Sequence, residues 1–195
     1  GLSPVKSADL VRAFEQPEGN PFFPVFSARL TDIIEKERPF LAGFSLNYLS
    51  QALCTFAMAG FISRRFPGIK IVLGGGLVTS WMRSPSWRSP FGGLIDLLVD
   101  GPGEYALLSL AGIEASNPDP PLPDYTPFPM KDYLAPGPVV PYSASTGCYW
   151  NRCSFCPERA EGNPYVPVPT PKALEHLHTL AGRTRPALVH LLDNA

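Results

Sequence analysis

Nine prolines fall between residues 117 and 141, and this stretch constrains the fold more than any other feature of the chain. Proline lacks a backbone N–H and cannot occupy the interior of a helix or a central strand. We therefore predict that residues 117–141 form a semi-rigid linker, which Tyr125, Phe128 and Tyr133 pin to a surface. A folded part is expected on either side of this linker.

The first part, residues 1–116, is predicted to contain a parallel α/β sheet. Three short apolar runs, each bounded by polar or glycine residues, are typical of buried strands, and helical patterns lie between and after them. This alternation favours a doubly wound, Rossmann-like sheet that either lacks its first βα units or has residues 1–38 in their place. The predicted strands are residues 40–46, 71–73 and 95–99, and the predicted helices are residues 50–66 and 105–115.

The remaining segments of the first part carry weaker patterns. Residues 1–29 contain four prolines and are expected to be irregular, with a short helix following at residues 31–36. A loop is expected between the second and third strands, through Trp81, Trp87 and Pro90.

The second part, residues 142–195, reads as the beginning of a βα barrel. A strand at residues 139–145 leads into a cysteine-containing loop, a helix follows at residues 170–181, and a further strand at residues 187–192. These elements make one and a half βα units. Two strands cannot close a barrel, so we expect a fragment that is truncated at its C-terminus and inactive by itself.

Three of the four cysteines lie within nine residues of one another, with the spacing C-x4-C-x2-C. A disulfide framework normally spreads cysteines along the chain, whereas thiolates on one tight loop converge on a soft metal centre. Cys148, Cys153 and Cys156 are therefore predicted metal ligands in a reducing, cytoplasmic compartment. If the metal centre is a cubane cluster with four irons, three cysteine ligands leave one iron without a protein ligand, open to a small chelating molecule.

Two other metal sites use similar spacings. A zinc-stabilised interaction module needs a fourth Cys or His, and His176 and His178 lie on a predicted helix where they point to different faces. A two-iron ferredoxin also needs a fourth cysteine, and Cys54 is the only one left. Cys54 lies between apolar neighbours and reads as a buried helical thiol.

The cysteine loop resembles the cluster loop of radical S-adenosylmethionine (SAM) enzymes, whose common pattern is C-x3-C-x-aromatic-C. Phe155 fills the aromatic position, and this chain has one extra residue between its first two cysteines. The resemblance implies a [4Fe-4S] cluster that cleaves SAM reductively to a 5′-deoxyadenosyl radical. It also implies an electron donor such as flavodoxin or ferredoxin, and a small-molecule or peptide substrate. We expect Tyr149, Trp150 and Phe155 to keep water from the cluster.

The first part resembles the cobalamin-binding domain that precedes many radical SAM barrels, through small residues at the ends of its strands. The resemblance implies cobalamin as a further candidate cofactor, although the D-x-H-x-x-G motif is absent and no histidine precedes His176. Plain turn geometry, or a relic domain without cobalamin, are the alternatives. The candidate cofactor-binding residues are Ser45, Gly74, Gly75, Gly76, Gly101, Gly103 and Glu104.

Two further candidates end the last strand. Carboxyl-end residues of barrel strands tend to be functional, and the resemblance places Asp193 and Asn194 near the amino group of SAM. A turn beginning at Asp193 is the alternative. The net charge of −1, without a dense Lys/Arg cluster, argues against a nucleic-acid surface. No run of about 18 apolar residues indicates a transmembrane helix.

Overall fold

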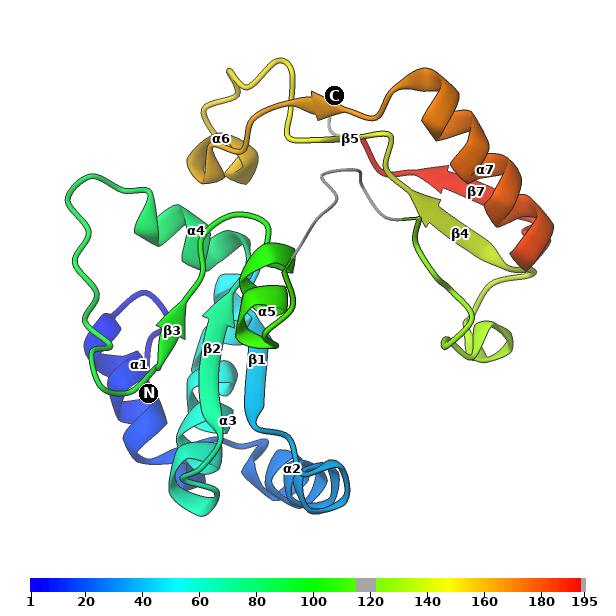
Figure 1. The fold of residues 1–195 in the computed structure, drawn as a ribbon. Coiled ribbons are helices and arrows are strands. Elements are labelled where there is room, and N and C mark those ends of the chain that lie inside the picture. The colour runs from blue at the N-terminus through cyan, green and yellow to red at the C-terminus, as the bar shows by residue number, and fades with distance from the viewer. Residues whose placement is uncertain (115–121, 194–195) are drawn as a thin grey trace. The chain divides into compact units, whose positions relative to one another are not determined.

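A computed structural model describes residues 1–114 and 122–193 (Figure 1). The chain divides into two compact units, Gly1–Glu114 and Ala115–Ala195, which are described separately below. Both units mix helices with parallel strands, so the predicted α/β class is confirmed at that level.

The first unit opens with helices where residues 1–29 were expected to be irregular, and the helix predicted at residues 31–36 is part of the second α-helix. They are α1 (Ser7–Glu15), the 3-10 helix η1 (Pro17–Gly19) and α2 (Phe23–Glu37). The prediction failed because the prolines stand at helix starts, where the missing N–H has no intrahelical partner to lose. Pro17 is the first residue of η1, and Pro24 lies in the first turn of α2.

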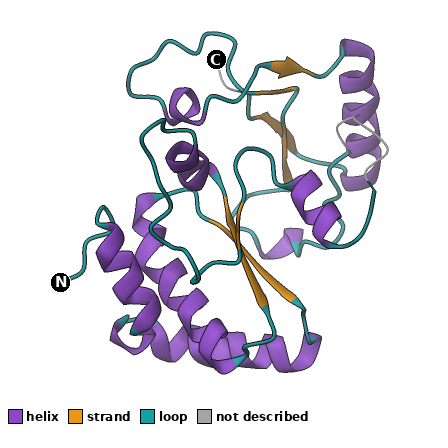
Figure 2. Ribbon diagram, turned by 60° about the vertical axis from the view of Figure 1, so that its left-hand side comes forward, coloured by secondary structure: helices purple, strands orange, loops and turns teal. Residues whose placement is uncertain are grey.

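The sheet of the first unit is parallel and has the order β1-β2-β3 (Figure 1); its strands are among those drawn in orange in Figure 2. Its strands are β1 (Leu41–Ser45), β2 (Lys70–Gly74) and β3 (Leu97–Leu98). The three predicted strands are therefore present, but β3 is shorter than expected. At its start the Asp96 carboxylate, rather than a backbone carbonyl, accepts a hydrogen bond from the Ile71 N–H, with an N···O distance of 2.7 Å.

Four helical segments complete the first unit. They are η2 (Leu49–Gln51), α3 (Ala52–Arg65), α4 (Gly76–Met82) and α5 (Glu104–Leu110). Helix α4 lies inside a segment that was predicted to be a loop. The hydroxyls of Thr79 and Ser80 donate to the carbonyls of Gly75 and Gly76, one turn earlier, which satisfies polar side chains within the helix.

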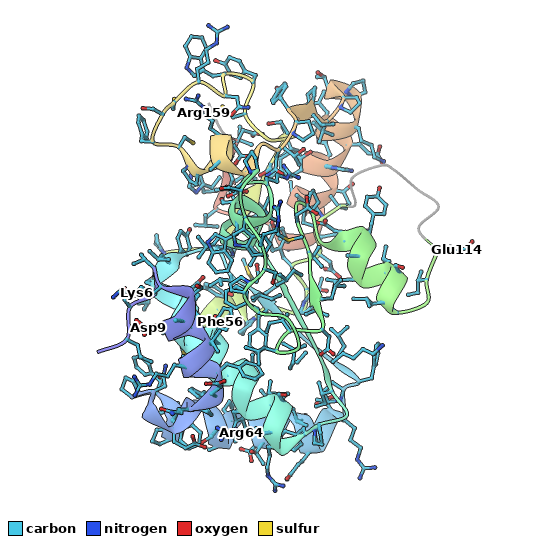
Figure 3. All side chains as sticks on the ribbon, turned by 90° about the vertical axis from the view of Figure 1, so that its left-hand side faces the viewer. Lys6, Asp9, Phe56, Arg64, Glu114 and Arg159 are labelled. Atoms are coloured by element: carbon cyan, nitrogen blue, oxygen red, sulfur yellow. The ribbon has the colours of Figure 1, made fainter. Side chains whose placement is uncertain are left out.

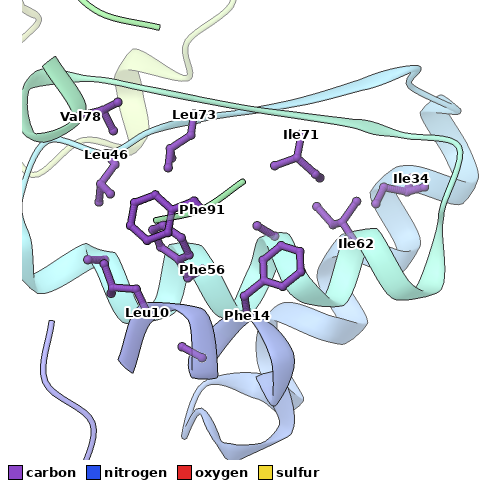
Figure 4. Packing of buried hydrophobic residues seen from close by; sticks show 13 residues of the cluster. Leu10, Phe14, Ile34, Leu46, Phe56, Ile62, Ile71, Leu73, Val78 and Phe91 are labelled. Atoms are coloured by element: carbon purple, nitrogen blue, oxygen red, sulfur yellow. The ribbon is translucent and has the colours of Figure 1, made fainter. Parts of the chain in front are cut away.

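Helix α3 lies between the sheet and α1, as Figure 4 shows. Phe56 is fully buried and stacks at a tilt on Phe91, with ring centroids 4.6 Å apart (Figures 3 and 4). On the same face, a Cβ added to Gly60 would lie 1.9 Å from the carbonyl oxygen of Phe14. The absence of a side chain at position 60 thus sets the distance between α1 and α3.

The second unit contains two small sheets and two α-helices in its described residues. After the 3-10 helix η3 (Met130–Asp132), the strands are β4 (Val139–Tyr142), β5 (Ser145–Thr146), β6 (Val166–Pro167) and β7 (Leu188–Leu191). The helices are α6 (Pro157–Glu161) and α7 (Thr170–Thr184). Strands β4 and β7 pair in parallel, as predicted for consecutive strands of a βα unit, while β5 and β6 pair in antiparallel fashion.

The linker is anchored by one of its three predicted aromatic residues. The Tyr125 hydroxyl donates to the carbonyl of Pro141, and its ring packs against the core of Val140, Tyr142 and Leu180. Phe128 packs on the Tyr125 ring, with centroids 6.4 Å apart, and stays 51% exposed, while Tyr133 is 56% exposed. The expectation that Phe128 and Tyr133 also pin the linker to a surface stays a prediction.

We predict that Gly60→Ala destabilises the first unit by about 2 kcal/mol or more, because the added methyl group overlaps backbone atoms of α1. Chemical denaturation followed by circular dichroism measures the change. Gly182→Ala is the matched control, since Gly182 lies in α7 with no atom within 4 Å of an added Cβ. An unchanged or higher stability of Gly60→Ala would show that α1 and α3 are not held at this distance.

Candidate metal centre

The cysteine loop is closed at its base by a two-residue antiparallel ladder. Ser145 pairs with Pro167 and Thr146 with Val166, so the two ends of the loop lie side by side. Gly147 follows at once with φ of +70°, and a Cβ there would lie 2.4 Å from the carbonyl oxygen of Pro164. Glycine is thus needed at position 147 both for its backbone conformation and for the closeness of the returning chain.

The three cysteines of the loop are free thiols and half-buried. The Asn151 N–H points at the Cys148 Sγ, with an N···S distance of 3.5 Å, and Asn151 has φ of +43°. The Cys156 N–H donates to the carbonyl of Cys153 at 3.3 Å, which makes a tight turn between the last two cysteines. Helix α6 begins directly after Cys156, at Pro157.

The chemistry of this donor set fits a soft metal or an iron–sulfur cluster. It offers three reduced sulfurs on one short loop, and a backbone N–H that favours charge on one of them. The present positions of the side chains are more open than a loaded site requires. Among residues 1–114 and 122–193, no three Cys, His, Asp or Glu side chains gather as a metal site. Binding would therefore need the cysteine side chains to turn toward one another.

The aromatic residues of the loop do not shield it within this unit. Tyr149, Trp150 and Phe155 are 64%, 52% and 87% exposed, so the expectation that they exclude water is not met by the unit's own packing. Tyr149 lies edge-on to Tyr165 at a centroid distance of 6.0 Å. The Arg152 guanidinium lies 5.3 Å from the centroid of the Trp150 ring.

Polar contacts brace the loop on the side of α6. The Asn163 amide donates to the carboxylates of Glu158 and Glu161, at 3.4 Å and 3.1 Å. Arg159, which Figure 3 labels, donates to the carbonyl of Arg152 across the loop at 3.5 Å. Sequence reasoning missed Asn163, although an Asn just after a glycine that ends a helix is a recognisable turn signal.

The Asp193 carboxylate accepts hydrogen bonds from residues at the base of the cysteine loop. One carboxylate oxygen accepts from the Ser145 hydroxyl at 2.7 Å and the other from the Ala144 N–H at 3.2 Å. Burial raises the pKa of Asp193, but the hydrogen bonds from Ser145 and from backbone N–H groups outweigh it and hold the pKa below its usual range. Both oxygens thus already have protein donors. Asn194 lies outside the described residues.

His176 is not available as a fourth ligand in this arrangement. It is buried in the core of the second unit, and its Nδ1 lies 3.3 Å from the Tyr142 hydroxyl. It lines a cavity of about 230 Å³ beside Tyr142. His178, two residues on, is exposed, as expected for the opposite face of α7. Cys54 is half-buried in α3, and burial raises the pKa of its thiol, which keeps it protonated.

At the carboxyl edge of the first sheet, the structure brings Ser45 together with Gly74, the last residue of β2, and with Gly75 and Gly76. Asn47, which sequence reasoning missed, joins them. Its amide donates to the Ser45 hydroxyl at 3.2 Å and accepts from the Gly76 N–H at 2.9 Å. Gly75 has φ of +99°, and a Cβ there would lie 2.7 Å from backbone atoms of Leu46. Packing therefore accounts for Gly75.

The other two candidate glycines lie after β3. The Gly101 N–H donates to the Thr79 hydroxyl at 2.9 Å, which ties this turn to α4 and so to the same edge. Gly101 has φ of +68°, so glycine suits the turn conformation. Gly103 has no atom within 4 Å of an added Cβ, and Glu104, the first residue of α5, is exposed. Gly74 also tolerates a side chain, because an added Cβ would lie 3.5 Å from its nearest neighbour, the carbonyl oxygen of Val99.

No helix in the part of the chain that the structure describes is long and apolar enough to cross a membrane. No family model matches the sequence, and neither a curated protein nor a solved structure matches it.

We predict that Gly147→Ala opens the base of the cysteine loop, because the methyl group overlaps Pro164 and the backbone has a positive φ. The expected loss of stability is about 2 kcal/mol or more, measured by denaturation of the cluster-free protein. Gly182→Ala again supplies the control. If Gly147→Ala is as stable as that control, the loop is not closed against Pro164.

Proposed function

We propose that the second unit carries the cluster loop of a radical SAM enzyme, with Cys148, Cys153 and Cys156 as the ligands of a [4Fe-4S] cluster. The observation that carries this proposal is one short loop with three free thiols, closed at its base by β5 and β6. The spacing and the aromatic residue before the last cysteine support the same assignment.

The surroundings of the sulfurs suit a negatively charged cluster. The Asn151 N–H is aimed at the Cys148 sulfur, and such hydrogen bonds stabilise charge on a thiolate. Arg152 and Arg159 add positive charge on the same loop, with their effect reduced by exposure to solvent. Hydrogen bonds to sulfur and nearby charges are the means by which a protein tunes the reduction potential of a cluster.

The number of cysteine ligands determines what chemistry the proposed cluster could support. Cys148, Cys153 and Cys156 would hold the cluster, and the chemistry that it would supply is one-electron reduction of SAM, which would begin a radical reaction. The protein's own share is to hold three sulfurs, to leave the fourth position open, and to keep the loop base fixed. The exposed rings of Tyr149, Trp150 and Phe155 are then the surface that SAM, substrate or an electron donor such as flavodoxin or ferredoxin would cover.

Reconstitution with iron and sulfide under anaerobic conditions tests the proposal. Wild-type protein is expected to bind about four irons per chain, with the broad absorption of a [4Fe-4S] cluster. Cys153→Ala is expected to lose most of this iron. Cys54→Ala, the matched control, is expected to retain it, because Cys54 lies in the other unit.

Two results would contradict the proposal. The first is one equivalent of zinc with neither iron nor sulfide after anaerobic purification, which would favour a zinc-stabilised interaction module. The second is loss of iron from Cys54→Ala equal to the loss from Cys153→Ala, which would favour a site with four cysteine ligands.

Cobalamin is proposed as a second ligand, at the carboxyl edge of the first sheet. The support is the gathering of Ser45, Gly74 and Gly101 at one edge, where parallel sheets bind ligands. The Asn47 side chain argues against cobalamin binding, because it already accepts the hydrogen bond that the Gly76 N–H could otherwise donate to a ligand. Residues 1–175 contain no histidine, so the cobalt would receive no imidazole from the first unit.

Titration with hydroxocobalamin, followed by absorption spectroscopy, tests the cobalamin proposal. Wild type is expected to bind hydroxocobalamin. Gly74→Ala is expected to bind it about tenfold more weakly, because the added methyl group takes up space at the strand ends where cobalamin is proposed to bind, and its contacts with Val99 are ordinary ones that the fold tolerates. Circular dichroism checks that the fold is kept. Absence of binding by wild type would remove cobalamin and leave the cluster proposal untouched.

A further inference from the structure

We infer that Asp193 is a positioning residue for the cysteine loop, acting through Ser145. This inference rests on the proposed function of that loop and assigns Asp193 a part in it. The two carboxylate oxygens accept from the Ser145 hydroxyl at 2.7 Å and the Ala144 N–H at 3.2 Å. Ser145 is three residues before Cys148, and Asp193 is two residues beyond the end of β7.

The contact joins parts of the chain that are far apart in sequence. Strand β7 pairs in parallel with β4, and the Leu192 N–H extends this pairing to the Tyr142 carbonyl at 2.9 Å. Asp193 then crosses to the segment that turns away from β4 toward the loop. It thereby ties the start of the cysteine loop to the larger sheet of the unit, 48 residues away in sequence.

The other end of the loop meets the same segment. The Val168 N–H donates to the Ala144 carbonyl at 2.7 Å, and Ser145 pairs with Pro167. Residues 144 and 145 are therefore held from both sides, by β6 through the backbone and by Asp193 through its carboxylate. The Ser145 side chain itself is held by the Asp193 carboxylate, and a hydrogen bond to an ionised acceptor is stronger than one between neutral groups.

This arrangement gives Asp193 a role other than contact with SAM. Each of its oxygens accepts from a donor at the base of the loop, and hydrogen bonds hold its pKa below the usual range, which keeps it ionised. An ionised carboxylate can accept more than two hydrogen bonds, so this positioning role does not depend on whether a ligand also binds there. The two contacts fix the direction in which Gly147 and Cys148 leave the sheet.

The rate at which each thiol is alkylated in the folded, cluster-free protein tests the inference. Trypsin cleaves after Arg152 and Arg159, so Cys148 is read by mass spectrometry apart from Cys153 and Cys156. Asp193→Asn and Ser145→Ala are each expected to raise the rate at Cys148 about tenfold, as expected for loss of a hydrogen bond to a charged acceptor. Cys54, in the other unit, is the internal reference and should keep its rate.

Two matched variants separate positioning from general loosening. Ser145→Thr keeps the hydroxyl and is expected to restore the wild-type rate at Cys148. Asp124→Asn removes a similar contact, since the Asp124 carboxylate accepts from the Thr126 N–H at 2.9 Å in the linker, and it is expected to leave Cys148 unchanged. If Ser145→Ala and Ser145→Thr react alike, or Asp124→Asn matches Asp193→Asn, the inference is wrong.

The reconstituted protein provides the second readout. The electron paramagnetic resonance spectrum of the reduced cluster is expected to differ between Ser145→Ala and wild type, and to return with Ser145→Thr. An unchanged spectrum in Ser145→Ala would overturn the link between Asp193 and the cluster. Failure of wild type to bind any cluster would instead overturn the proposed function, while the alkylation rates would still decide whether Asp193 positions Cys148.

Discussion

The closure of the cysteine loop at its base is the constraint on which the second unit depends. Two short strands pair across it, and the backbone of Pro164 lies where a side chain at position 147 would have to be. A loop held in this way can present three sulfurs on one side without a core of its own. Its exposed rings and half-buried thiols follow from the same fact, because a short closed loop buries little surface.

The strands of the two parallel sheets and the helices α3 and α7 were accessible to sequence reasoning because their signals are local. Apolar runs of strand length identified β1 and β2, and Thr170-Pro171 marked the start of α7. The helical residues before position 31 were not identified, because the same prolines that interrupt a helix also begin one. Pro17 and Pro24 stand at such beginnings, and position within a helix cannot be read from composition.

In the candidate site too, local patterns could be predicted from the sequence, whereas contacts between residues distant in sequence could not. The cysteine spacing is a local pattern and was visible at once. Asn47 and Ser145 were invisible because each acts through a partner that is distant in sequence: Asn47 bridges to Gly76, and Ser145 to Asp193. The rings of the loop were expected to exclude water from their apolar character alone, but burial depends on what packs against them. Exposed apolar side chains are common on protein surfaces, so apolar character by itself did not decide the burial of Tyr149, Trp150 and Phe155.

Glycines illustrate how two explanations compete at one position. At Gly75 and Gly147 the backbone conformation and a close neighbour already require glycine, so no ligand need be invoked for them. At Gly103 the space is open, and at Gly74 an added Cβ would make ordinary van der Waals contact with Val99, so packing does not require glycine at either position. A ligand-binding role is therefore better tested at these two positions, where a substitution leaves the fold intact.

The central claim is that three cysteines share one cluster and leave one iron without a protein ligand. Mössbauer spectroscopy of protein reconstituted with isotopically enriched iron tests it most directly. The account predicts a [4Fe-4S] spectrum in which one iron differs from the other three and alone changes when a small chelating molecule such as SAM or citrate is added. A spectrum of four equivalent irons that does not change when the chelator is added, or the spectrum of a two-iron cluster, would contradict it.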